Sequence, residues 1–286
     1  MQEVIYSPHH DFYIDRVLQA PSRHMSTFHL HRKYEIYLQL EGERRYFIED
    51  SVYTIQPGDL ILVDRDEIHK VDSLDEHPYS RYVLNFSSAC LEQLQETMAS
   101  VRTYDIFKCG VKVLHLDAEN LALTHGLLER IRLLSDAATR EDRLLRQLIL
   151  AELLLQIGRL VKSMGRKPRS DDASNEIIHR ICVYIGAHYR ENLKLTGIAE
   201  AFYISPSYLC RLFKRATGLS VVEYINGVRV KAAKELLESS GAKITEISER
   251  AGFSTSSHFA RVFKTNTGLS PQHYRTYYKK ASFKNQ

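Results

Sequence analysis

Four side chains near the amino end have the types and spacing of metal ligands. His29 and His31 are two positions apart, Glu35 follows four residues later, and His69 lies further along the chain. Imidazole nitrogens combined with a carboxylate suit zinc, iron, manganese or nickel. Alternate residues of a strand project from one face, so His29, His31, Glu35 and Tyr37 would lie on the same side. The sequence therefore predicts that these side chains form one site, which His69 would close from a later strand.

The same group also suits a pocket for a small organic molecule. The chain has 17 tyrosines and no tryptophan, so tyrosine rings would stack against such an effector. Three alternatives are open: a divalent metal ion, with no other cofactor expected; a small effector such as a sugar; or no ligand. The candidate metal ligands are His29, His31, Glu35 and His69, and the candidate effector residues are these four together with Tyr13, Arg23, His24, Tyr37 and Tyr82.

The segment that carries these residues has the pattern of a small β barrel or sandwich. Short apolar or alternating runs occupy residues 35–40, 45–48, 51–55, 59–63 and 81–84, with turn pairs such as Glu41-Gly42 and Pro57-Gly58 between runs. Many short strands in series are typical of such folds. We therefore expect strands to position the candidate ligands.

Residues 91–161 have a helical period instead. Within 141–161, Leu144, Leu145, Leu148 and Leu155 contribute to an apolar stripe. Such a stripe would contact a second copy of the chain in a homodimer, or it would pack on its own barrel. Residues 163–174 are polar and are interrupted by Gly165 and Pro168, which is typical of a linker.

The positive charge of the chain is concentrated after this linker. Residues 174–286 contain 17 Lys and Arg against 8 Asp and Glu, a net charge of +9, whereas the preceding residues carry −5. Such asymmetry is expected when one domain neutralises the phosphates of a nucleic acid and the other does not.

The basic part contains an internal repeat. Residues 209–220 and 259–270 lie fifty positions apart and are identical at seven of twelve positions. A shorter helical piece precedes each copy, at 196–200 and at 245–249, so each unit predicts a helix, a tight turn and a second helix. In the second unit Gly252 can supply a positive φ angle, and Ser254 or Thr255 can cap the next helix. In the first unit Ser205 and Pro206 start the second helix, but Tyr203 stands where the turn glycine would be.

The second helix of each unit has an outward face that could enter a major groove. Arg211 and Arg261 could pair with guanine or grip a phosphate, and Lys214 and Lys264 could hold the DNA backbone. The alternative is that the arginines fold back on acidic neighbours. The other outward positions near the helix starts are Ser207 and Tyr208 in the first unit and Ser257 and His258 in the second.

A single long helix is predicted between the two units. Ser220 and Glu223 form a capping-box pattern, and the helical pattern runs over 221–239 before Gly241. Nineteen residues make a rod of roughly 28 Å. Such a rod would set the two recognition helices about one DNA turn apart, roughly 34 Å.

At these residues the chain resembles the AraC/XylS family of transcription regulators. The likeness covers about 177–278 and rests on the second-unit patterns at 247–253, 259–264 and 268–275. It implies a seven-helix DNA-binding domain with recognition helices at about 206–216 and 255–265, a promoter as partner and contact with RNA polymerase. By the same likeness the base-facing positions are Ser207, Cys210, Arg211, Ser256, Ala260 and Arg261, where Cys210 and Ala260 differ from the larger polar residues of some relatives.

The amino-terminal pattern resembles the two motifs of the cupin barrel, which such regulators often carry. We therefore expect an α+β, two-domain protein: a cupin-like sensing and dimerisation domain at 1–162, a linker at 163–174, and a DNA-binding domain with two helix-turn-helix units at 175–286. The function expected is DNA binding that responds to a small effector, without enzymatic activity. The alternatives are a metal-dependent cupin enzyme fused to a DNA-binding domain, and a constitutive DNA binder with a structural amino-terminal domain.

The remaining composition favours a cytoplasmic protein without membrane contact. No run reaches the eighteen or so apolar residues of a spanning helix, and the first thirteen residues lack the pattern of a signal peptide. The four cysteines have no CxxC spacing, so they indicate neither a zinc site nor a disulfide framework.

Overall fold

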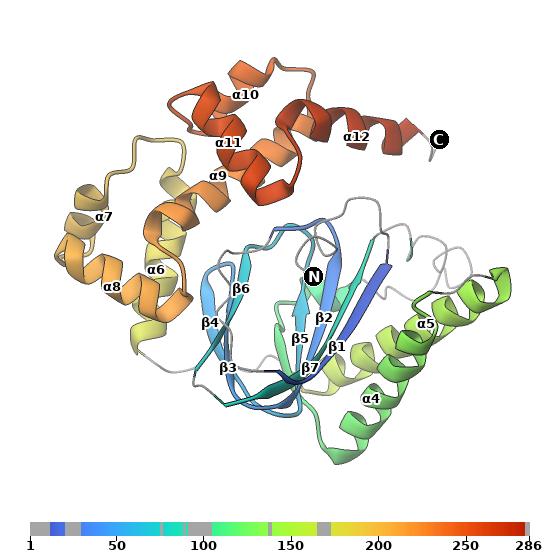
Figure 1. The fold of residues 1–286 in the computed structure, drawn as a ribbon. Coiled ribbons are helices and arrows are strands. Elements are labelled where there is room, and N and C mark those ends of the chain that lie inside the picture. Colours follow the sequence, from blue (N-terminus) through green and yellow to red (C-terminus); the bar gives the residue numbers. More distant parts are fainter. Residues whose placement is uncertain are drawn as a thin grey trace.

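The computed structural model describes residues 12–20, 30–74, 77–87, 90, 105–136, 139–164 and 173–283. Figure 1 shows a β-rich amino-terminal domain with helices packed on it, and a carboxyl-terminal domain made of helices. This arrangement confirms the predicted α+β, two-domain class.

The β domain consists of two antiparallel sheets. The larger sheet has the order β1-β7-β2-β5-β8 and the smaller has the order β4-β3-β6. The strands are β1 (Phe12–Ala20), β2 (Tyr34–Glu41), β3 (Arg44–Ile48), β4 (Ser51–Ile55), β5 (Asp59–Val63), β6 (His69–Ser73), β7 (Tyr79–Phe86) and β8 (Val113–His115). The two sheets face each other in a cupin-like sandwich, and the described strands do not close into one continuous barrel (Figure 1).

The alternation predicted for β2 is confirmed. Tyr37 packs between the two sheets with Tyr46 of β3 and Val83 of β7. Ile36 and Leu38 belong to the core on the opposite face of the larger sheet. Side chains therefore fill much of the space between the sheets, and odd-numbered β2 residues face that space.

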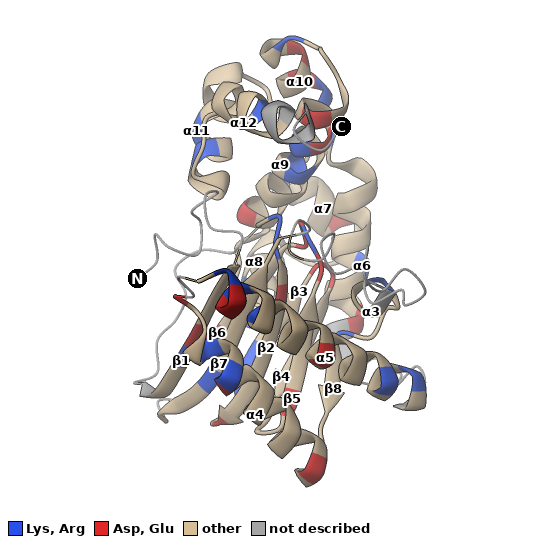
Figure 2. Cartoon of the chain, turned by 90° about the vertical axis from the view of Figure 1, so that its right-hand side faces the viewer, with Lys and Arg blue, Asp and Glu red and all other residues tan. Residues whose placement is uncertain are grey.

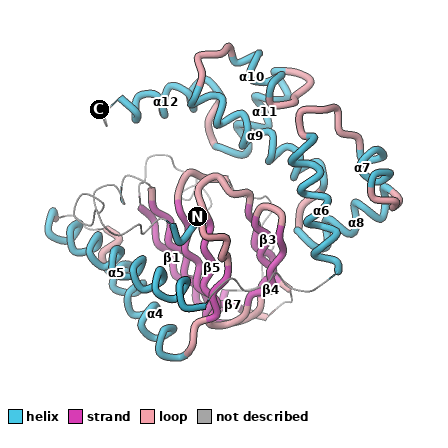
Figure 3. The backbone as a smooth tube through the Cα atoms, turned by 180° about the vertical axis from the view of Figure 1, so that it is seen from behind, coloured by secondary structure: helices cyan, strands magenta, loops and turns pink. Residues whose placement is uncertain are grey.

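Within the described ranges between β7 and the helical domain lie α3 (Asp105–Lys108), α4 (Ala118–Leu133) and α5 (Arg140–Met164). The long helices α4 and α5 cover the outer face of the larger sheet, as seen from behind in Figure 3. On α5, Ile149, Leu153 and Ile157 are buried in this contact, so the helix packs on its own domain. The stripe leucines Leu144, Leu145 and Leu148 stay exposed, at 56%, 45% and 52%.

The sequence prediction of a helical period over 91–161 misses β8, and the runs chosen as strands miss β1. The later strand that was expected to carry His69 is β6. The three residues of β8 pair with β5 at the sheet edge, where Leu114 lies opposite Leu60. A three-residue strand has no period of its own, so only the tertiary pairing reveals it. The predicted linker 163–174 overlaps the end of α5 and the start of α6, and its remaining residues lie outside the described ranges.

The described residues 173–283 form the seven helices that the family resemblance implied. They are α6 (Ala173–His188), α7 (Leu195–Ala201), α8 (Pro206–Thr217), α9 (Val221–Ser239), α10 (Ile244–Arg250), α11 (Ser256–Thr267) and α12 (Pro271–Phe283). The predicted connecting helix is confirmed as α9, which starts with a complete capping box. The Ser220 hydroxyl accepts from the Glu223 amide, and the Glu223 carboxylate accepts from the Ser220 amide.

The helical domain docks on the smaller sheet and on the loops beside it. Phe47 and Ile68 of the β domain are buried in the same core as Tyr224 and other residues of the helical domain. The Phe47 and Tyr224 rings meet edge to face at 5.8 Å. Polar contacts surround this core: Lys231 with Glu49 at 2.8 Å, Lys234 with Asp66, Arg32 with Glu238 at 3.0 Å, His179 with Asp50 at 3.0 Å, and Lys70 with the Gly218 carbonyl at 2.7 Å.

Within the described ranges, none of the helices combines the length and the apolar character needed to cross a bilayer.

Candidate functional site

The second helix of each repeat unit, α8 and α11, begins and ends in the same way. The Ser205 hydroxyl accepts from the Tyr208 amide at 3.2 Å, and the Thr255 hydroxyl accepts from the His258 amide at 3.2 Å. Each helix ends at a left-handed glycine, Gly218 with φ 73° and Gly268 with φ 75°. These caps fix where α8 and α11 start and end, so equivalent residues occupy equivalent positions on the two helices.

One face of α8 and one face of α11 are buried, and the opposite face of each helix is open to solvent. The buried residues Leu209 and Phe213 of α8 correspond to Phe259 and Phe263 of α11. The predicted DNA-binding positions lie on the opposite face. Ser207, Tyr208, Arg211, Lys214, Ser256, Ser257, Ala260, Arg261 and Lys264 are exposed, whereas Cys210 and His258 are half-buried.

The two arginines on this face are available to a ligand. Neither Arg211 nor Arg261 forms an ion pair with any described residue, so the alternative in which they fold back on acidic neighbours is not seen there. Lys214 lies 3.8 Å from Glu223, an exposed pair that costs little to separate.

The turns of the two units have the same backbone conformation despite their different residues. Tyr203 has φ 56° and is 97% exposed, whereas Gly252 has φ 84°. A Cβ on Gly252 would collide with the Tyr189 carbonyl and lie 2.9 Å from the Arg190 Cα. The turn of the second unit therefore requires glycine both for the positive φ angle and because a side chain would not fit. The turn of the first unit requires only a positive φ angle, which Tyr203 adopts.

In the β domain, His31, Glu35 and His69 come together as predicted. All three are buried, and their potential ligand atoms lie within 4.8 Å of one another. The Nε2 atom of His31 is 3.3 Å from the Glu35 Oε2 atom, and the Nε2 atom of His69 is 3.9 Å from the same oxygen. The Tyr46 hydroxyl, which the sequence analysis missed, donates to Glu35 Oε1 at 2.5 Å.

Burial and charge shift the pKa values in this cluster. Burial alone would raise the pKa of Glu35, but the hydrogen bond with His31 and the charges of His69 and His31 hold it well below its usual range. Burial lowers the pKa of His69 to about 4, although the Glu35 charge opposes that shift. Near neutral pH the cluster therefore contains an ionised carboxylate beside a neutral His69 imidazole.

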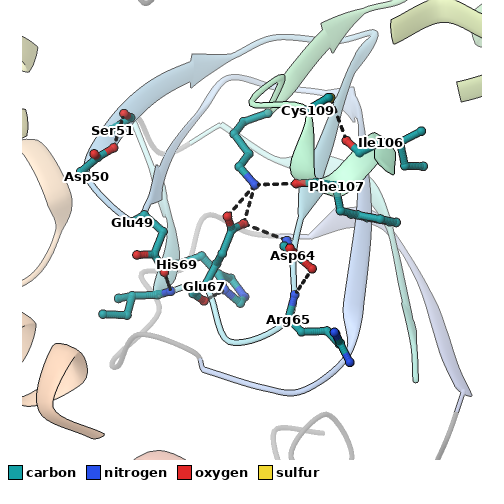
Figure 4. A network of polar contacts seen from close by, with 12 residues as sticks. Glu49, Asp50, Ser51, Asp64, Arg65, Glu67, His69, Ile106, Phe107 and Cys109 are labelled. Carbon is teal, nitrogen blue, oxygen red and sulfur yellow. Dashed lines mark hydrogen bonds and ion pairs between the residues drawn. The ribbon is translucent and has the colours of Figure 1, made fainter. Parts of the chain in front are cut away.

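The loop that carries His69 is held by polar contacts around Glu67, shown in Figure 4. The Glu67 carboxylate accepts from Lys112 Nζ at 2.6 Å and from the Asp64 amide at 2.8 Å. The Ile68 amide donates to Glu49 Oε1 at 2.8 Å. The His69 ring is thus placed by a loop whose ends are fixed independently.

Two further polar side chains, Arg81 and Asn85 of β7, lie on the face of the larger sheet that Glu35 and Tyr37 share. In the β2–β7 register Asn85 is opposite Glu35 and Arg81 is opposite Gln39. Both amide atoms of the fully buried Asn85, and the NH1 atom of Arg81, have no hydrogen-bond partner among the described residues. The cross-strand register identifies these residues, and the sequence alone does not give that register.

The other predicted effector residues are not all in this group. Tyr13 lies opposite Asn85 in the β1–β7 register, and its pKa is raised, mainly by burial. Tyr82 faces the other side of the sheet, where its hydroxyl donates to Glu129 of α4 at 2.6 Å. Tyr82 therefore belongs to the packing against the helices, which corrects its assignment to the effector group. Arg23, His24 and His29 lie outside the described residues.

Comparisons with known proteins match both halves of the chain. A model of the AraC-like ligand binding domain matches residues 12–154, and a helix-turn-helix domain model matches 198–277. The Msm operon regulatory protein of Streptococcus mutans is 26% identical over 85% of this chain and 84% of its own length. An uncharacterised helix-turn-helix-type regulator of Escherichia coli, YijO, is 36% identical over 46% of each chain.

Among solved structures, ToxT from Vibrio cholerae O395 is similar, with a TM-score of 0.38 and 15% identity over 93% of this chain and 97% of that one. The ligand-binding model covers half of the sequence, and the helix-turn-helix model covers both repeat units. The chain therefore belongs to the AraC family of DNA-binding transcription regulators, with an AraC-like ligand-binding domain ahead of its helix-turn-helix domain.

Proposed function

We propose that this regulator binds DNA with α8 and α11 in two successive major grooves. One duplicated observation carries the proposal: each helix starts at an oxygen cap, ends at a left-handed glycine and exposes an arginine, Arg211 or Arg261, at the equivalent position. An exposed arginine near the start of a recognition helix is suited to two hydrogen bonds with one guanine.

The connecting helix and the surface charge support this mode of binding. The nineteen residues of α9 span roughly 28 Å, which suits recognition helices about one DNA turn, roughly 34 Å, apart. Lys214 and Lys264 lie one turn beyond the arginines and would hold phosphates. Figure 2 shows Lys and Arg residues on α9 and α11, in the part of the chain with a net charge of +9.

A small polar effector would occupy the space between the two sheets. Polar atoms of Asn85 and Arg81 that have no hydrogen-bond partner within the described ranges are buried there, and an unsatisfied buried group costs about 1–3 kcal/mol. A ligand hydroxyl could accept from Asn85 Nδ2 or Arg81 NH1 and donate to Asn85 Oδ1, whereas a ligand carboxylate could accept from the two nitrogen atoms. A sugar or a small organic anion is therefore the class of effector that these polar groups favour, and Tyr13 and Tyr37 lie on the same face of the sheet.

The docked contact between the domains gives the effector a route to the DNA-binding helices. Lys70 of β6 holds the Gly218 carbonyl at the end of α8, and Glu49 holds Lys231 of α9. An effector that binds unequally to the docked and undocked arrangements would shift their populations, and with them the affinity for DNA.

We also propose that the regulator is a homodimer through the exposed leucines of α5. Leu144 and Leu148 are one turn apart, and charges of both signs, including Glu141 and Arg143, lie beside them. In a two-fold interface the same surface patch of each protomer faces its copy. Positive and negative side chains around the patch can then lie opposite charges of the other sign on the partner. Contact with RNA polymerase follows from the family resemblance.

Selection from a randomised DNA library tests the proposed DNA contacts. We expect the wild-type chain to select two sequence elements about 10 base pairs apart. Arg211→Ala and Arg261→Ala should each lose discrimination at one position of a different element, at a cost of about 1–3 kcal/mol. Arg159→Ala, which removes an exposed arginine from α5, is the matched control. An unchanged sequence profile for both recognition-helix variants would overturn the proposal.

A further inference from the structure

We propose that Cys210 of α8 and Ala260 of α11 each recognise the methyl group of a thymine, which lies next to the guanine that the following arginine binds. This inference rests on the proposed function, because it requires both helices to lie in major grooves. It adds a second base to each of the two sequence elements. Each element would then contain a thymine beside a guanine, read by a small apolar residue and an arginine.

The two residues hold equivalent positions in the repeat. In each helix the small residue directly precedes the exposed arginine, and an exposed lysine follows one turn later, Lys214 in α8 and Lys264 in α11. Residues four apart share one face of a helix. Cys210 and Ala260 therefore lie along the outward face, and the matching caps place them at the same distance from the start of each helix.

Both side chains can be reached from that face. Cys210 is half-buried and lines a hollow in the surface together with Arg211 and Lys214. It forms no disulfide with any described residue. Ala260 is exposed. A group that projects from the edge of a base into the major groove would therefore contact the side chain at either position.

The two residues are both small and apolar, which limits the base groups that they can recognise. Alanine has no hydrogen-bonding group in its side chain, and a cysteine thiol forms only weak hydrogen bonds and behaves as a small hydrophobe. The donors and acceptors of the base edges therefore offer little to either residue. The methyl group of thymine is the apolar group that the major groove presents, and small apolar side chains contact it.

The difference in length between the two neighbouring side chains supports this assignment. A short side chain contacts a base only where the helix backbone comes close to the floor of the groove, and the thymine methyl group projects toward the protein from that floor. The longer arginine reaches the O6 and N7 atoms of a guanine next to it. A long amide side chain in place of Cys210 or Ala260 would instead pair with an adenine.

Replacement of single thymines by deoxyuridine, which lacks only the methyl group, tests the inference. The full-length chain is titrated with the two-element site selected from the randomised library. We expect the loss of one methyl group beside either guanine to weaken binding by about 4-fold. Deoxyuridine at a thymine outside both elements is the control and should leave the Kd unchanged. A selected site without thymine beside the guanines, or a Kd unaffected by either replacement, would overturn the inference.

Glutamine variants assign each thymine to one residue. Cys210→Gln and Ala260→Gln should each change the preferred base from thymine to adenine in one element only, by at least about 5-fold. Cys210→Ala stays small and apolar, so it should keep the sensitivity to deoxyuridine. Ala201→Gln, which places the same side chain at an exposed alanine of α7, is the matched control and should leave the selected sequence unchanged.

The arginine variants separate this inference from the proposed function. If Arg211→Ala and Arg261→Ala alter the selected sequence but the glutamine variants do not, the thymine contacts are wrong and the proposed function stands. If the arginine variants also leave the sequence unchanged, the proposed function fails as well. Melting temperatures of the glutamine variants show whether they are folded, and deoxyuridine binding by the wild-type chain tests the inference without any substitution.

Discussion

The turn of each helix-turn-helix unit depends on a single residue with a positive φ angle. Gly252→Ala should lower the free energy of unfolding by more than about 2 kcal/mol, because left-handed strain of about 1 kcal/mol adds to a collision with the Tyr189 carbonyl. Urea unfolding of the full chain measures this change. Gly268→Ala is the matched control, since Gly268 has φ 75° and no atom within 4 Å of the added Cβ.

We expect Gly268→Ala to cost only the backbone strain, about 1 kcal/mol. The free energy of unfolding of Tyr203→Gly should differ from that of the wild type by less than about 1 kcal/mol. The relief of backbone strain in the folded state offsets the added conformational freedom of the unfolded chain. Similar losses in both glycine variants would show that the close approach at Gly252 contributes nothing.

At the scale of single residues, only some of the candidate ligand residues could be predicted from the sequence. Glu35 and Tyr37 share a face because alternation along one strand is a local rule. His31 precedes β2 and reaches the same site through its loop, so alternation did not apply to it. Tyr82 was misassigned because its face depends on which neighbour it pairs with, and that register is a long-range property.

At the scale of elements, helix periodicity predicted α9 and the two recognition helices well, since caps and turn residues are encoded in the sequence next to them. Short strands were predicted less well. β6 begins with His69-Lys70, and both side chains are buried. His69 lies near Glu35 of the larger sheet, and Lys70 donates to the Gly218 carbonyl of the helical domain. No local pattern carries that information.

The exposed face of α5 supports a prediction about assembly. Leu144→Glu combined with Leu148→Glu should convert a dimer to a monomer, because each buried interface leucine contributes about 1.5–3 kcal/mol and the introduced charges would lose their water. Sedimentation velocity measures the change. Leu123→Glu, at an exposed leucine of α4, should leave the dimer intact. A monomeric wild-type chain at micromolar concentration would contradict the homodimer.

At the scale of the whole molecule, the docking of the two domains was not predictable, because its residues are scattered over the chain. Phe47 lies on β3, between Tyr46 and Ile48, whose side chains pack between the sheets. Phe47 itself points the other way and is 1% exposed because the helical domain covers it, with the Tyr224 ring of α9 at 5.8 Å. Sequence periodicity predicts the elements within each domain. The fit between two folded surfaces leaves no periodic pattern in the sequence, so periodicity could not predict it.

This contact yields a prediction about cooperativity. Phe47→Asp should undock the helical domain, because a carboxylate cannot stay buried beside Tyr224 and the loss of a buried phenylalanine costs about 3–5 kcal/mol. The radius of gyration from solution scattering should then increase, and calorimetry should resolve two unfolding transitions. Phe47→Leu keeps an apolar side chain and should retain the compact form. If the Phe47→Asp variant keeps the radius of gyration and the single unfolding transition of the wild type, the docked core does not join the two domains. If the variant expands but still binds the selected DNA, the helical domain binds DNA by itself and the β domain only restrains it.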